Sequence, residues 1–145
     1  MTLTPQQIAD TSAEAMWRDD EACKGLGMVV QSVGPGTATL TMKVTADMTN
    51  GHGTCHGGFI FTLADSAFAY ACNSYNQRVV AGQAAITFIA PAFAADVLTA
   101  HATEVQLYGR SGIYDVRVTR QSGDVVAEFR GHSRTIKGTH FNEEE

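Results

Sequence analysis

The sequence has few of the residues that build specialised scaffolds. It holds three cysteines and three prolines in 145 residues, and 17% of its residues are charged. This composition excludes a disulfide framework, a collagen-like chain and a disordered segment, and it favours a reducing compartment. The N-terminus lacks a charged segment followed by an apolar one, so no secretory signal is visible and we expect a cytoplasmic protein.

Length and charge bound the function further. The chain has the length of one domain, so we expect a single domain over residues 1–145, with a helix within residues 1–24 and an acidic, solvated tail at 138–145. Residues 1–21 carry a charge of −4, residues 143–145 carry −3, and the rest carries +2. A slightly basic body with acidic ends argues against nucleic-acid binding and leaves room for a small anionic ligand.

The hydrophobic pattern predicts an α+β fold. Residues 5–22 read as a helix capped by Thr4, and residues 59–72 read as a buried helix that starts near Gly58. That apolar run is too short to span a bilayer, so we expect no membrane partner. Strand-like runs occupy residues 28–33, 37–44, 79–89, 97–107, 113–120 and 125–136. The economical arrangement is a curved antiparallel sheet of about six strands wrapped around the apolar helix.

Asp65 stands in the middle of the apolar helix. An unpaired, ionised carboxylate is costly to bury, so this residue needs a reason. It is either a working carboxylate or one bonded to the backbone or to an arginine from a neighbouring strand.

The loop "HGTCHGG" precedes the same helix. Gly57 and Gly58 allow close approach of a ligand to the free N–H groups of a helix N-terminus, which suits an oxyanion, although these glycines could also serve only a tight turn. His52, Cys55 and His56 are too close in sequence to hold one metal ion without strain, so we assign no metal. A nucleophilic Cys55 stays an alternative.

The spacing of Gly57 and Asp65 constrains any joint mechanism. Eight residues of helix correspond to a rise of about 12 Å, whereas both groups would have to lie within about 3 Å of one reacting group. If they act together, Gly57 of one subunit must meet Asp65 of its partner across a two-fold axis, giving two sites per dimer.

The last strand contributes a possible anchor for phosphates. Arg130, His132 and Arg134 occupy every second position and so share one face of this strand, near the turn formed by residues 109–112. A solvated outer face is an equally good interpretation.

The stretch "NGHGTCHGGFIFTLADSAFAYA" resembles the signature of hotdog-fold acyl-CoA thioesterases, in particular the phenylacetic acid pathway group. The likeness continues through "ITFIAPAFAADVLTAHATEVQLYGRSGIYDVRVTR" and "VAEFRGHSR", and so covers roughly residues 25–137. The resemblance implies a hotdog fold: a curved sheet around a long central helix.

The resemblance also implies roles for individual residues. Asp65 becomes the nucleophile or the general base, the Gly57 N–H becomes the oxyanion donor, and His56 and Asn50 position the carbonyl or the water. Some relatives carry a hydroxyl residue on the strand after the helix, where this chain offers only Gln83. The implied contacts to substrate and CoA are Gly58, Gln83, Gly109, Arg110, Ser111, Gly112, Arg130 and Arg134.

The implied reaction is hydrolysis of an acyl-CoA thioester to a free acid and CoA. We expect aryl-acetyl groups such as phenylacetyl or hydroxyphenylacetyl, or medium-chain acyl groups, in a pocket where Ala64, Ala67, Ala84 and Ala85 leave space. CoA is part of the substrate, and we expect no separate cofactor. The resemblance implies a homodimer that completes the site, and a homotetramer. The alternatives are a hotdog hydratase or dehydratase that uses His56, and an acyl-CoA-binding protein without turnover.

Overall fold

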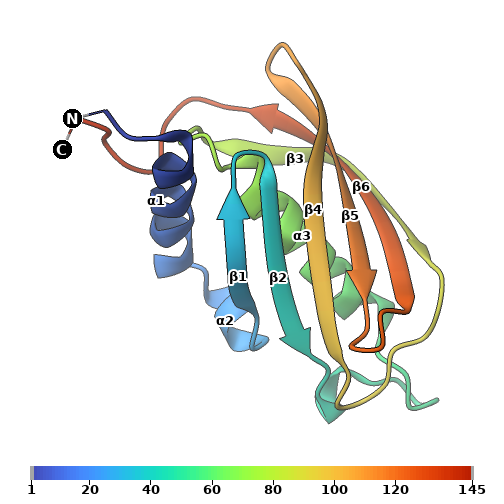
Figure 1. The fold of residues 1–145 in the computed structure, drawn as a ribbon. Helices are drawn as coiled ribbons and strands as arrows, with labels where there is room; N and C mark the ends of the chain where they lie inside the picture. The colour runs from blue at the N-terminus through green and yellow to red at the C-terminus, as the bar shows by residue number, and fades with distance from the viewer. Residues whose placement is uncertain (1, 145) are drawn as a thin grey trace.

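The computed structural model describes residues 2–144 and shows a curved sheet packed around one long helix (Figure 1). Two short helices come first, followed by a β-hairpin, the long helix and four more strands. The elements are α1 (Pro5–Arg18), α2 (Glu21–Gly25), β1 (Val29–Gly34), β2 (Thr37–Lys43), a 3-10 turn (Ala46–Met48), α3 (Gly57–Cys72), β3 (Val79–Phe88), β4 (Val97–Tyr108), β5 (Ser111–Thr119) and β6 (Val125–Thr135). The predicted α+β arrangement is therefore present, with strand limits within a few residues of those expected.

The sheet is antiparallel throughout, in the order β1-β2-β4-β5-β6-β3. Strands β1 and β3 form its two edges. Along β3 most side chains are exposed, including the apolar Val80 and Phe88. An edge strand leaves one row of backbone N–H and C=O groups without a strand partner, so the β3 edge is open to a further strand.

The core lies between α3 and the concave face of the sheet. On β2 the alternating residues Ala38, Leu40 and Met42 are buried, as their pattern predicts. The Phe68 ring of α3 packs against Tyr114, with ring centroids 5.6 Å apart. It also lies so close to Gly131 that a methyl group built there would be 2.8 Å from the ring. The space between helix and sheet is filled by side chains.

The N-terminal helix differs from its prediction. A single helix over residues 5–22 is wrong, because the chain breaks after Arg18 and restarts as α2. Asp20 caps the second helix by accepting a hydrogen bond from Cys23 N, and its other oxygen accepts one from Tyr70 OH at 2.8 Å. The expected cap at Thr4 is confirmed, with Gln7 completing a capping box.

The C-terminal segment contacts Asn76, while Glu143 and Glu144 of the expected acidic tail are exposed. Asn76 accepts hydrogen bonds from the backbone N–H groups of His140 and Phe141, and its amide donates to Glu143 at 2.9 Å. Glu145 lies outside the described residues. Within residues 2–144, no helix is both long and apolar enough to cross a membrane.

Candidate active site

The N-terminus of α3 presents a free backbone donor. His56 caps the helix, and its Nδ1 accepts a hydrogen bond from Gly58 N at 3.3 Å. The neutral ring then carries its proton on Nε2. Among the residues that the structure describes, Gly57 N–H has no hydrogen-bond acceptor. Of the two glycines proposed at the oxyanion site, Gly57 therefore has the available N–H, and that of Gly58 is used by the cap.

Asn50 organises the loop before the helix. Its Oδ1 accepts hydrogen bonds from His52 N at 2.9 Å, from Thr54 N at 3.3 Å and from Thr54 Oγ1 at 3.1 Å. Cys55 N in turn donates to Ala92 O at 2.7 Å, which holds the loop against the segment after β3. The Asn50 oxygen is thus occupied within the loop, so only its amide N–H groups are left for a substrate or water.

Asp65 lies on the side of α3 that the sheet does not cover. The exposed Gly58 and the partly exposed Thr62, Asp65 and Ala69 follow one another at spacings of four, three and four, and so form one stripe along the helix. The expectation of a fully buried Asp65 is wrong, because the side chain is only half-buried in the single chain.

The Asp65 carboxylate has no hydrogen bond or ion pair to any residue from 2 to 144. The alternative in which an arginine neutralises it is therefore absent from this chain. Desolvation by burial raises the pKa of Asp65 above its ordinary value. A carboxylate that gains from taking up a proton is suited to act as a general base.

One chain does not bring Gly57 and Asp65 together. They sit at the first and ninth positions of the same straight helix, separated by a rise of about 12 Å. The His56 ring is at the same end as Gly57, where its Nδ1 bonds Gly58 N. The two halves of the expected chemistry are therefore two turns apart within the protomer.

The expected CoA contacts divide into two groups. Arg134 pairs with Ser111 across β5 and β6, and Thr135 N donates to Arg110 O at 2.7 Å, so the 109–112 turn and Arg134 lie together. This cluster is at the end of the sheet near the C-terminus of α3, where Gly109 and Ser111 line a cavity of about 240 Å³ with Cys72.

The other expected contacts lie farther along the sheet. Arg130 is four residues from Arg134, about 13 Å along the strand. Its Nε and Nη2 donate hydrogen bonds to the two carboxylate oxygens of Asp115 at 2.6 and 2.8 Å. Gln83 is exposed on β3, opposite His132. The basic stripe of the last strand is therefore partly neutralised by an acid on β5.

A groove at the N-terminus of α3 includes residues that the sequence reasoning missed. It measures about 470 Å³ and its walls include Gly57, Ile60, Phe88, Ile89 and Pro91. Phe88 and Ile89 are 52% and 54% exposed. The signal in the sequence was an apolar pair at the end of a predicted strand, followed by Ala90 and Pro91.

The expectation that Ala64 and Ala67 of the helix leave space for a pocket is wrong. Ala64 and Ala67 have no exposed surface and pack inside the core. Ala85 instead lines a shallow cavity of about 300 Å³ with Asp115 and Arg130.

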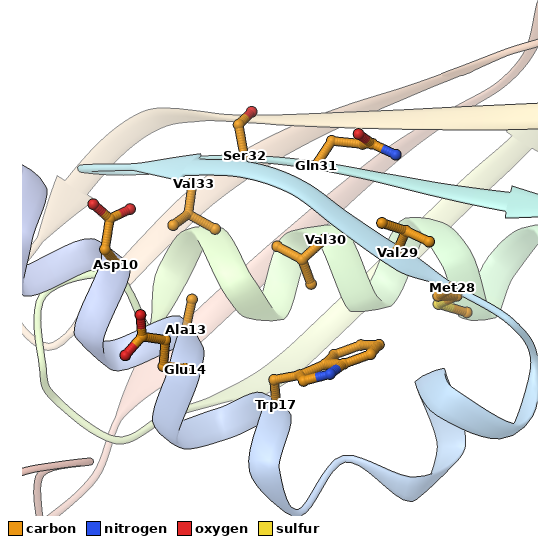
Figure 2. A pocket seen from close by; sticks show the side chains of 10 residues that line it. All are labelled: Asp10, Ala13, Glu14, Trp17, Met28, Val29, Val30, Gln31, Ser32 and Val33. Carbon is orange, nitrogen blue, oxygen red and sulfur yellow. The ribbon is translucent and has the colours of Figure 1, made fainter.

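Another groove lies elsewhere, between α1 and β1. It measures about 490 Å³, and Figure 2 shows Trp17 and Ala13 of the helix facing Val30 and Val33 of the strand. None of the expected site residues lines it. Among residues 2–144, no group of three or more His, Cys, Asp or Glu side chains is placed to hold a metal ion.

The chain is similar to known thioesterases and esterases. The family model described as Thioesterase superfamily matches residues 52–127. The acyl-coenzyme A thioesterase PaaI of Escherichia coli strain K12 is 47% identical over 128 residues, covering 88% of this chain and 91% of that protein. A putative esterase of Archaeoglobus fulgidus is 30% identical over 130 residues, which cover 90% of this chain and 84% of the esterase.

Solved structures give the same result. The structure of the E. coli PaaI protein from the phenylacetic acid degradation operon superposes with a TM-score of 0.92 at 45% identity, over 94% of this chain and 99% of that one. A hypothetical thioesterase of Streptococcus pneumoniae with coenzyme A gives a TM-score of 0.73 at 26% identity, over 77% and 90%. The chain therefore belongs to the thioesterase superfamily, as a hotdog-fold hydrolase of thioesters.

Proposed function

We propose that the protein hydrolyses acyl-CoA thioesters to a free acid and CoA. The observation that carries this proposal is the half-buried Asp65, which has no partner among residues 2–144, on a helix whose N-terminus offers the N–H of Gly57. The name of the E. coli relative specifies acyl-CoA esters, and the streptococcal structure contains CoA. Both support CoA as the thiol part of the substrate.

The proposed reaction uses one base and one oxyanion donor. Asp65 takes a proton from a water molecule while the water oxygen attacks the thioester carbonyl carbon. The carbonyl oxygen becomes an oxyanion that accepts a hydrogen bond from Gly57 N–H, at the positive end of the α3 dipole. The C–S bond then breaks, and CoA leaves as a thiolate that takes up the proton held by Asp65, which restores the carboxylate. Direct attack by the Asp65 carboxylate, followed by hydrolysis of the anhydride, is the alternative first step.

His56 and Asn50 have supporting roles in this proposal. The Nε2–H of His56 is available to donate to the carbonyl or to the water, because Nδ1 is occupied by Gly58 N. The amide N–H groups of Asn50 can position the same groups, while its oxygen holds the loop. Both residues act as neutral donors, so neither has to transfer a proton.

The proposed site is completed by a second copy of the chain. Because Gly57 and Asp65 are about 12 Å apart along one helix, the donor has to come from the partner helix. The open β3 edge, with Val80 and Phe88 exposed, offers a surface for a two-fold pairing of strands. Antiparallel helices then place the partner's N-terminus towards this chain's Asp65. We expect two such dimers to form a tetramer.

This arrangement also relates the CoA contacts to the reaction. The 109–112 turn and Arg134 lie at the C-terminal end of α3, which is the end that an antiparallel partner's N-terminus approaches. Arg134 is exposed, so its guanidinium can reach a phosphate. Arg130 contributes only if a phosphate displaces Asp115 from it.

We propose aryl-acetyl or medium-chain acyl groups as substrates. The groove of about 470 Å³ beside Gly57 has apolar walls from Phe88, Ile89 and Pro91. That volume falls within the range of small-molecule pockets and suits an aromatic ring or a chain of moderate length. The operon of the E. coli PaaI protein supports phenylacetyl-type groups.

A thiol-release assay tests the proposed activity. We expect the wild-type protein to release free CoA from phenylacetyl-CoA, hydroxyphenylacetyl-CoA or octanoyl-CoA, and the Asp65→Asn variant to do so at least about 100-fold more slowly. Equal rates in both proteins would remove Asp65 from the mechanism. Hydration of enoyl-CoA without thiol release would favour the hydratase, and tight binding of CoA esters with no thiol released would favour a binding protein.

Mixed dimers test the shared site. Gly57→Pro removes the N–H at the first helical position, where proline is tolerated. Dimers that combine a Gly57→Pro subunit with an Asp65→Asn subunit should regain about half of the wild-type sites, because one site keeps both intact groups. Each variant mixed only with itself is the control. No recovery in isolated heterodimers would refute a site built from two subunits.

A further inference from the structure

We propose that Arg78 and Lys137 bind the phosphate groups of the substrate. Together with Arg110 and Arg134 they form a group of four cations at the end of β6, which we call the cationic corner. The inference rests on the proposed hydrolysis of acyl-CoA, and it adds two residues that are not among the expected CoA contacts. They lie just before β3 and just after β6.

The positive charges of this acidic chain are unevenly distributed. The net charge is −5, and there are ten lysines and arginines. Within residues 2–144, Arg117, Arg120 and Arg130 form ion pairs with carboxylates, and no side chain of the cationic corner does. Glu143, the single acid among residues 136–143, accepts a hydrogen bond from Asn76 instead. Four of the ten cations therefore gather in one place without a counter-charge from the described chain.

Strand pairing places Arg110 beside Arg134. Arg134 of β6 is opposite Ser111, the first residue of β5. The next residue, Thr135, donates its N–H to Arg110 O at 2.7 Å. Because neighbouring strands are about 5 Å apart, the two arginines are neighbours on one side of the end of β6.

Arg78 and Lys137 meet on the other side of β6. Arg78 O accepts a hydrogen bond from Ile136 N at 2.8 Å, and Arg78 N donates to Gly138 O at 3.0 Å. Lys137 is the residue between these two contacts. Arg78 and Arg110 thus flank the end of the same strand, about two strand spacings or 10 Å apart. All four side chains of the cationic corner are exposed.

The guanidinium of Arg78 is oriented before any ligand binds. Its Nε donates to Thr139 O at 3.2 Å, and its two Nη groups have no acceptor within residues 2–144. The segment that carries Thr139 is itself fixed, because His140 Nε2 bonds Asn73 Oδ1 at 2.8 Å and Gln77 O at 3.1 Å. A cation held in place loses less conformational freedom when it binds an anion.

The cationic corner is suited to the phosphates and to no other part of the substrate. Its charges lie within about a Debye length of one another at physiological ionic strength, so they repel, and a ligand with several negative charges relieves this repulsion. CoA carries a diphosphate and a 3′-phosphate, whereas its pantetheine arm and the expected acyl groups are uncharged. Arginine and lysine both bind phosphate, and arginine does so through paired hydrogen bonds.

Thioesters with and without the nucleotide test the proposal. We expect Arg78→Gln and Lys137→Gln each to raise KM about threefold for the acyl-CoA that the wild type hydrolyses fastest, and the double variant to raise it about 10-fold, with kcat changed less than about twofold. KM for the pantetheine thioester of the same acyl group should be equal in all these proteins. Arg78→Lys should recover part of the loss, because it keeps the charge.

Arg117→Gln is the matched control, since Arg117 is an exposed arginine of the same sheet whose charge is paired with Glu128. It should leave KM for the CoA ester unchanged. An unchanged KM in the double variant overturns the proposal. An equal rise in KM for the pantetheine thioester also overturns it, because the effect would then lie in the fold or the acyl site.

A binding measurement does not depend on turnover. In calorimetric titrations with free CoA, we expect the double variant to bind at least about 10-fold more weakly than the wild type and than Arg117→Gln, and added salt to weaken the wild type more than the double variant. If the wild type releases no thiol from any acyl-CoA, the proposed function fails, and weaker CoA binding by the double variant still supports the phosphate site. If thiol is released and both proteins bind CoA equally, only the role of Arg78 and Lys137 fails.

Discussion

Asp96 fastens the segment after β3, and its replacement gives a quantitative test of the structure. The Asp96 side chain is 7% exposed, and its ion pair with Arg120 joins this segment to the turn between β5 and β6. The carboxylate accepts hydrogen bonds from Arg120 Nε at 2.9 Å, Arg120 Nη2 at 3.2 Å, Gln121 Nε2 at 2.8 Å and Phe93 N at 2.8 Å. Asp96→Asn removes the charge and keeps the size of the side chain.

The magnitude follows from the pKa of the carboxyl. The hydrogen bond from Arg120, followed by those from Gln121 and Phe93 N, lowers the pKa of Asp96 from 3.8 to about 2. At about 1.36 kcal/mol for each factor of ten in acidity, this corresponds to about 2.5 kcal/mol of unfolding free energy. Arg120 is 25% exposed, and screening by solvent reduces the contribution to about 1.5–2.5 kcal/mol.

The pH dependence has a definite sign. The folded pKa lies below the unfolded one, so the stabilisation is complete well above pH 3.8 and disappears as the pH falls towards 2. The difference in unfolding free energy between wild type and Asp96→Asn should therefore be full at pH 7 and 5, and should shrink at pH 3. The segment that Asp96 fastens also includes Ala92, whose carbonyl oxygen accepts a hydrogen bond from Cys55 N in the loop before α3. We therefore expect faster amide exchange at Cys55 in Asp96→Asn than in the wild type.

Urea unfolding followed by the fluorescence of the single tryptophan, Trp17, measures this difference. Asp115→Asn is the matched control. It also breaks an arginine–carboxylate pair, but both side chains are about half exposed, at 52% and 42%. We expect a loss below about 0.5 kcal/mol for the control. Equal losses in the two variants at pH 7, or a difference for Asp96→Asn that is unchanged at pH 3, would refute the reasoning.

Three further variants probe other parts of the fold. Burial raises the pKa of Asp65, so ionisation of this group lowers the stability of the folded state as the pH rises. Asp65→Asn should therefore raise Tm at pH 7 while abolishing most turnover. A lower Tm would contradict this. Gly131→Ala should lower the unfolding free energy by about 1–3 kcal/mol, since its methyl would meet the Phe68 ring at 2.8 Å; wild-type stability would show that the core has space there. Thr4→Ala should cost about 1 kcal/mol through the lost cap of α1, and an unchanged urea midpoint would show that α1 frays independently of global unfolding.

Much of the fold follows from local patterns in the chain. The alternation over residues 37–44 predicts the buried face of β2, because successive side chains of a strand point to opposite sides. The glycines before an apolar run predict the start of α3, which begins at Gly57. Asp65 could be identified as a candidate for the same kind of reason, since a charged residue in an apolar helix is unusual whatever surrounds it.

Other features depended on residues that are distant in sequence. The break between α1 and α2 is accompanied by a bond from Tyr70 to Asp20, fifty positions apart, and no local helix signal contains that contact. Arg130 was expected to be available to a phosphate, but the register of β5 and β6 places Asp115 directly beside it. The half exposure of Asp65 follows from which side of α3 the sheet covers.

The sequence by itself therefore determined most of the elements, with the exception of the break between α1 and α2, and the two residues on which the proposed chemistry depends. Local periodicity and helix-end preferences were sufficient for these, because they arise from backbone geometry within a few residues. Only the tertiary structure decided that, within residues 2–144, Gly57 N–H has no acceptor, that Asp65 is unpaired and half-buried, and that the Phe88 ring lies beside Gly57. These depend on strand order and register, which bring distant parts of the chain into contact.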